Sequence, residues 1–144
     1  MLRIVLISAC VFVSCTAIAL AGSDSDAVRK FGLYGAGWAY QGKCAQFQFF
    51  FAEDSSGAPE TYGKQPSGQI QDRERISNVR AMPGDRLAFE TSGGRNRMYV
   101  VYEKVGSLLR VVESKDLKSG QMLTQNGRMT WGGRSPSPWF ERCS

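Results

Sequence analysis

The sequence has no histidine among its 144 residues. This absence excludes the Ser-His-Asp and Cys-His catalytic arrangements, because each uses an imidazole as its general base. It also excludes zinc sites that depend on histidine ligands. The acidic residues do not follow the spacing of a calcium-binding loop, and no glycine-rich loop ends in the Gly-Lys-Ser or Gly-Lys-Thr of a phosphate site. We therefore expect no catalytic residue, no metal and no cofactor.

Long hydrophobic runs are also missing, except at the N-terminus. There a positive residue, an apolar stretch from Ile4 to Val13 and the ending Ala19-Leu20-Ala21 form the three parts of a secretory signal peptide. We expect cleavage near Ala21, so that residues 22–144 reach the periplasm or are secreted. Two alternatives stay open. The segment could remain as a membrane anchor, or the chain could be a lipoprotein whose lipid on Cys15 tethers it to a membrane.

The exported part carries a modest positive charge. Without Arg3 the 18 Lys and Arg residues become 17 against 13 Asp and Glu, which leaves a net charge of +4. No basic run exceeds two adjacent residues, so neither the charge pattern nor the location favours a nucleic-acid partner. The partners that we expect are a small ligand or an envelope protein.

Two cysteines remain once the signal peptide is removed. Cys44 and Cys143 are expected to pair, because two cysteines in an exported chain usually form a disulfide. The bond would close a loop of roughly 100 residues and stabilise the fold by roughly 4–5 kcal/mol.

The glycine pattern indicates short strands joined by turns. All 16 glycines lie beyond residue 21, between runs of aromatic and β-branched residues. In the segment 44–52, Phe47, Phe49 and Phe51 share one face, and in 86–91 Leu87 and Phe89 point inward. Further strands are expected over 33–40, 60–64 and 76–82, in a hairpin of 97–104 with 108–113, and around the Asn126-Gly127 turn.

These strands predict an all-β fold, most simply an antiparallel up-and-down barrel of about eight strands. Residues 22–30 are polar and small and are expected to be a flexible lead-in to a single domain, 31–144. The segment 70–75 has no apolar face and is expected to be exposed. The tail 134–140 is too rich in proline for a central strand, and Cys143 would tether it.

Inward aromatic residues suggest a cavity for an apolar ligand, with basic residues at its rim for an anionic group. The residues expected to bind this ligand are Trp38, Tyr40, Phe49, Arg95, Arg97, Tyr99 and Arg110. Asp72 and Glu74 alternate with Arg73 and Arg75, which predicts ion pairing on the surface.

Two family resemblances bear on function. Gly35-Ala36-Gly37-Trp38 on a first strand, followed by a meander and a late cysteine, resembles the lipocalin-like barrels, although Ala36 stands where that family has glycine. This resemblance implies a non-catalytic ligand carrier. The segment 92–99 resembles the loop of periplasmic C-type lysozyme inhibitors. It implies the alternative function, an inhibitor or interaction module that acts on a hydrolase through exposed loops such as 92–97 or 135–140.

Overall fold

The computed structural model describes residues 23–93 and 96–144. The proposed signal peptide, its cleavage site and Cys15 lie outside these residues. No helix in the described part is long and apolar enough to cross a membrane. The elements are α1 (Asp24–Phe31), β1 (Gly37–Tyr40), β2 (Gln48–Glu53), β3 (Pro59–Lys64), β4 (Ile70–Met82), β5 (Arg86–Gly93), β6 (Asn96–Val105), β7 (Leu108–Asp116), β8 (Met122–Gln125), β9 (Arg128–Met129), η1 (Gly132–Arg134) and β10 (Trp139–Cys143).

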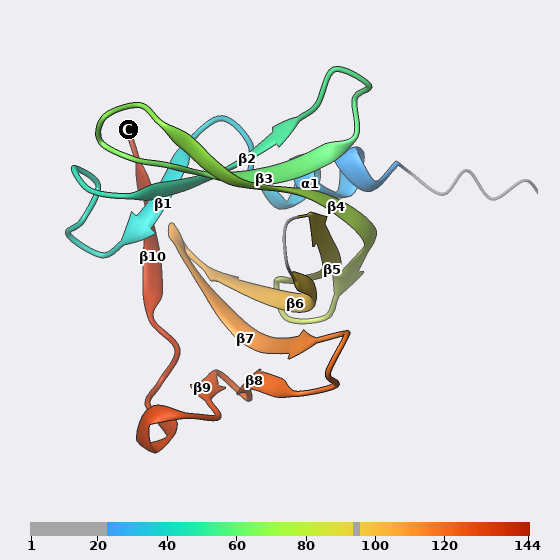
Figure 1. The fold of residues 1–144 in the computed structure, drawn as a ribbon, viewed down its shortest axis with the longest axis vertical. Coiled ribbons are helices and arrows are strands. Elements are labelled where there is room, and N and C mark those ends of the chain that lie inside the picture. Colours follow the sequence, from blue (N-terminus) through green and yellow to red (C-terminus); the bar gives the residue numbers. More distant parts are fainter. Residues whose placement is uncertain (1–22, 94–95) are drawn as a thin grey trace, which may run out of the picture.

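The strands form a closed antiparallel barrel, which confirms the fold expected from the sequence. Each strand from β1 to β7 pairs with the next, and β10 pairs with both β1 and β7, so that eight strands close the ring (Figure 1). The first half of β7 pairs with β10 and the second half with β8. The β8–β9 hairpin therefore lies beside the barrel wall and is not part of the ring.

The C-terminal tail has a larger role than a tether. Pro136 and Pro138 precede β10, so the strand itself contains no proline and can pair on both of its edges. Cys143 forms the expected disulfide with Cys44, with a Cα–Cα distance of 5.6 Å. The bond ties the β1–β2 connection to the end of the strand that closes the barrel.

The expected flexible lead-in is instead mostly helix. Ser23 caps α1 by accepting a hydrogen bond from the backbone N–H of Asp26, and Gly32 ends the helix in a left-handed conformation. Val28 is fully buried, and the Asp24 carboxylate accepts a hydrogen bond from the backbone N–H of Val79 on β4. These contacts fix the helix to the barrel.

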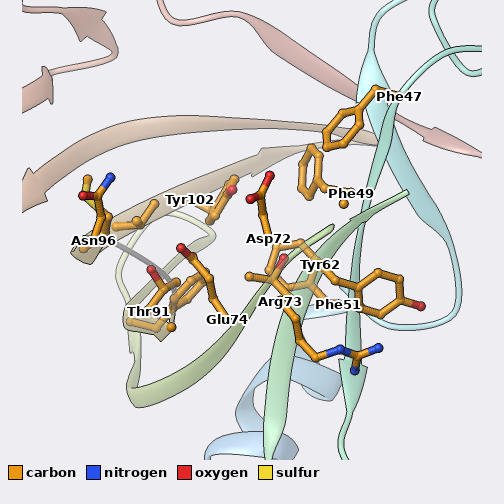
Figure 2. A pocket seen from close by; sticks show the side chains of 16 residues that line it. Phe47, Phe49, Phe51, Tyr62, Asp72, Arg73, Glu74, Thr91, Asn96 and Tyr102 are labelled. Atoms are coloured by element: carbon orange, nitrogen blue, oxygen red, sulfur yellow. The ribbon is translucent and has the colours of Figure 1, made fainter. Parts of the chain in front are cut away.

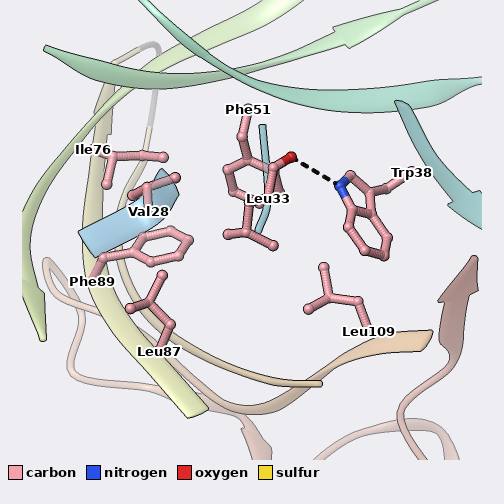
Figure 3. Packing of buried hydrophobic residues seen from close by; sticks show 8 residues of the cluster. All are labelled: Val28, Leu33, Trp38, Phe51, Ile76, Leu87, Phe89 and Leu109. Carbon is pink, nitrogen blue, oxygen red and sulfur yellow. Dashed lines mark hydrogen bonds between the residues drawn. The ribbon is translucent and has the colours of Figure 1, made fainter. Parts of the chain in front are cut away.

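The helix and the residues after it fill one half of the barrel. Val28 and Leu33 pack there against buried residues of the strands, and Trp38 donates a hydrogen bond from its indole Nε1 to the Leu33 carbonyl at 3.2 Å (Figure 3). The strand residues of this core are Trp38, Phe51, Ile76, Leu87, Phe89 and Leu109. Trp38 is 1% exposed, so it serves the packed core.

The segment 70–75 is the first half of strand β4. Its residues are mostly exposed, as expected, but they pair with β3 across a bulge between Thr61 and Gly63. Asp72 has a left-handed φ of 51° at this bulge. Backbone pairing with β3 therefore holds this segment as a strand, although it has no apolar face.

Candidate functional site

The half of the barrel that the helix leaves open contains a cavity of about 930 Å³. Its walls come from β2 to β6, and Figure 2 shows their side chains converging on one space. Phe47, Asp72 and Asn96 are exposed at its edge, so the cavity opens to solvent there. This volume lies within the range of pockets that hold one small molecule.

Aromatic rings form the base and one wall of the cavity. Phe51 and Phe89 separate it from the core, with ring centroids 6.2 Å apart in an edge-to-face arrangement. Tyr102 stacks on Phe89 at 5.6 Å and meets the edge of Phe51 at 5.8 Å, and Phe49 meets the edge of Phe51 at 5.8 Å. Because each ring packs against others, the wall is formed before any ligand binds.

Two carboxylates from β4 face this aromatic wall. Figure 2 shows Asp72 pointing toward Phe49 and Glu74 pointing into the space beside Thr91. Glu74 is half-buried, and burial raises the pKa of its carboxyl above the ordinary value. The charge of Asp72 raises this pKa further, while the neighbouring Thr91 hydroxyl lowers it.

Thr91 places a hydroxyl in the cavity wall without a partner. The residue is 4% exposed, and its Oγ1 makes no hydrogen bond with any residue that the structure describes. It lies beside Glu74 without reaching hydrogen-bond geometry. A buried hydroxyl without a partner is unfavourable, and a ligand with a polar hydrogen could relieve this cost.

Two glycines, Gly93 and Gly63, allow close contacts in the cavity wall that a side chain would prevent. Gly93 has a φ of 145°, and a Cβ at this position would lie 2.8 Å from the Arg73 carbonyl oxygen, so only glycine allows β5 to approach β4 beside Glu74. On β3, a Cβ at Gly63 would overlap the ring of Phe47. The absence of a side chain lets that ring lie over β3 at the edge of the cavity.

The residues expected to bind a ligand do not converge. Phe49 lines the cavity, whereas Trp38 belongs to the core. Tyr40 is 55% exposed and stacks on Phe140 at 5.1 Å, outside the cavity lining. Arg95 lies outside the described residues.

The remaining expected residues lie on the outer face of the barrel. Arg97 pairs with Glu90 at 2.7 Å. Tyr99 packs against a second cluster, formed by Ala88, Val101 and Val112. Arg110 pairs with Glu103 at 2.6 Å and stacks on Trp139 at 4.5 Å. The basic rim expected from Arg97 and Arg110 is therefore absent from the described cavity lining.

Strand parity could have identified several residues that the sequence analysis missed. Leu87 and Phe89 point inward, so Thr91 does too, and Ile76 likewise implies Glu74. Among residues 23–93 and 96–144, neither Asp72 nor Glu74 forms the surface ion pair expected for it. Arg73 pairs with Glu60 and Arg75 with Asp54, the latter at 3.9 Å.

The expected recognition loops are only partly described. In the segment 135–140, Ser137 is buried and its hydroxyl donates to the Val111 carbonyl, while Phe140 packs on the core. The segment 92–97 includes the two residues outside the described ranges. Within residues 23–93 and 96–144, no cluster of three or more His, Cys, Asp or Glu side chains could hold a metal ion.

Comparison of the chain with protein-family models, with curated proteins and with solved structures finds no match.

Proposed function

We propose that this protein is a non-catalytic binding protein of the cell envelope that carries one small, largely apolar ligand inside its barrel. The observation that carries the proposal is the aromatic cavity of about 930 Å³ in the half of the barrel that α1 does not fill. A barrel of eight strands can be filled completely by its own side chains. Here the helix, Leu33 and Trp38 fill only one half.

The composition of the cavity supports an apolar ligand. Six of its lining residues are phenylalanine or tyrosine, and Met98 and Val100 add aliphatic surface from β6. The six are Phe47, Phe49, Phe51, Tyr62, Phe89 and Tyr102. Polar and charged side chains line the same space and could orient the ligand. They are Thr61, Asp72, Arg73, Glu74, Thr91 and Asn96.

A fluorescence titration with the neutral probe N-phenyl-1-naphthylamine tests this proposal. The mature protein is expected to bind one probe molecule with a rise in fluorescence. Phe49→Ala should weaken binding about fivefold, because it removes one aromatic contact from the wall. Phe50→Ala is the matched control. Its ring is adjacent in sequence but stacks on Tyr62 at 5.4 Å and does not line the cavity, so binding should remain unchanged.

Circular dichroism of both variants confirms that each barrel is folded before the titration. No saturable binding by the folded wild-type protein would contradict the proposal. Equal weakening by the two variants would also contradict it, because the probe would then bind outside the cavity.

A further inference from the structure

The charge inside the cavity has the opposite sign to that of the whole exported chain. Asp72 and Glu74 face the cavity, and among the described lining residues the only basic one is Arg73. The Arg73 guanidinium pairs with Glu60 and lies over the Tyr62 ring at 5.0 Å. Figure 2 shows it directed away from the two carboxylates. The described side chains that face the ligand space therefore carry only negative charge.

The aromatic wall favours the same sign of ligand charge. The face of an aromatic ring carries partial negative charge and attracts cations, most strongly where water is excluded. Phe49 and Tyr102 lie on the side of the cavity toward which Asp72 points (Figure 2). A cationic group in this space would contact ring faces and carboxylates together.

The unpartnered Thr91 hydroxyl is an independent indication of a polar ligand group. Its Oγ1 is buried in the cavity wall and has no partner in the described part of the chain. An ammonium N–H could donate to this oxygen while its charge lies beside Glu74. A purely apolar ligand would leave the hydroxyl unpaired.

The basic residues of the neighbouring strands do not counter this arrangement. Arg97 is held by Glu90 on the outer face of β5 and β6, and Arg86 and Arg110 are both held by Glu103. Glu90 and Glu103 offset two of these three positive charges outside the barrel, where solvent also screens them.

We propose that the ligand is a cationic amphiphile: an organic ammonium group held by Asp72, Glu74 and the aromatic faces, attached to an apolar body that fills the space above Phe51 and Phe89. This inference rests on the proposed function, because it names the chemical class of the ligand in the same cavity. It replaces the anionic group expected from the sequence.

Calorimetric titration with three probes that share one apolar body tests the inference. The probes are 4-phenylbutylammonium, 4-phenylbutan-1-ol and 4-phenylbutyrate, each a phenyl ring on a four-carbon chain with a head group of different charge. At neutral pH and low salt, the ammonium probe should bind about tenfold more tightly than the alcohol. The butyrate should bind most weakly, because Asp72 and Glu74 repel it.

A double variant, Asp72→Asn with Glu74→Gln, identifies the groups responsible. It should reduce the preference for the ammonium probe over the alcohol to less than about twofold. Circular dichroism shows whether the variant is folded. Glu90→Gln is the matched control, because it removes a carboxylate from the outer face of β5 and should leave the preference intact.

The outcomes separate the inference from the proposed function. If the alcohol binds in the cavity but the ammonium probe binds no more tightly, or if the preference survives the double variant, the cationic ligand is refuted and the binding function stands. Tighter binding of the butyrate, lost in Arg95→Ala, would assign an anionic ligand instead. If the folded protein binds none of the three probes, the proposed function fails as well.

Discussion

Removal of the disulfide is the perturbation whose size follows most directly from the structure. Replacing both Cys44 and Cys143 with alanine opens a loop with a sequence separation of 99 residues. For a loop of that length, the chain-entropy model gives an entropy loss in the unfolded chain of about 16 cal/mol/K. This loss destabilises the unfolded chain by about 4.7 kcal/mol at ~25 °C. We expect the free energy of unfolding to fall by about this amount.

The loss is large relative to the stability of a domain of this size. Small domains unfold with roughly 5–15 kcal/mol, and for about 120 residues each kcal/mol corresponds to roughly 4 °C in melting temperature. The variant should therefore melt about 20 °C below the parent protein. The folded barrel should keep its strand pairing, because β10 pairs with both β1 and β7 without help from the bond.

Urea unfolding followed by circular dichroism measures this effect. The m-value should rise in the variant, because the unfolded chain without the bond exposes more surface. The wild-type protein treated with a thiol reductant is the control and should match the variant. A loss below about 2 kcal/mol with an unchanged m-value would refute the loop-entropy argument, because the bond would then not restrict the unfolded chain.

Three further predictions concern the packing of α1 in the barrel, the contact of Gly93 with β4, and the carboxyl of Glu74. Val28→Ala should lower the free energy of unfolding by about 2 kcal/mol, whereas Lys30→Ala, at an exposed position of the same helix, should lower it by less than about 0.5 kcal/mol. Equal effects in urea unfolding would mean that Val28 does not pack α1 into the barrel core. Gly93→Ala should cost about 2–3 kcal/mol, because its Cβ would meet the backbone of β4, whereas Gly106→Ala, with open space around it, should cost about 1 kcal/mol; the same measurement contradicts the close contact if the two costs are equal. The raised pKa of Glu74 means that its contribution to stability is fully present below the ordinary pKa and is lost as pH rises through the raised value. Glu74→Gln should remove this part of the pH profile of stability, and an unaltered profile would show that Glu74 is not desolvated.

The sequence predicted the parts of the fold that depend on local alternation and on cysteine number. Phe49 and Phe51 point inward as their spacing indicated, and so do Leu87 and Phe89. The Cys44–Cys143 bond was predicted from the two cysteines that lie beyond the expected signal peptide. The number of strands was predicted from the turn signals between them. Closure was predicted because a barrel is the simplest way to pair every strand edge.

The helix was missed because its segment has a single apolar residue that becomes fully buried, Val28. The signals that were present are at its ends: Ser23 as cap, acidic residues in the first turn and basic residues in the last. Which half of the barrel the helix fills depends on long-range packing, so the position of the cavity could not be predicted.

The cavity residues were difficult to predict because alternation is unclear on β4 and β6. On β4, alternation from Ile76 indicates that Glu74 faces inward, but the bulge at Asp72 interrupts the alternation there and hides the inward position of Asp72. On β6 both faces are partly apolar, since Tyr99 and Val101 pack outside the barrel. The sequence alone therefore does not show that Met98, Val100 and Tyr102 are the inward set.

We propose that one half of the barrel binds a ligand, whereas the other half is filled by side chains of the core. Methyl NMR during titration with N-phenyl-1-naphthylamine tests it most directly, because methyl groups lie in both halves. Saturable shifts at Met98 and Val100, with little change at Val28 and Leu33, are the result that the structure predicts. Shifts confined to surface methyl groups, or no saturable shifts at all, would contradict a binding cavity in this barrel.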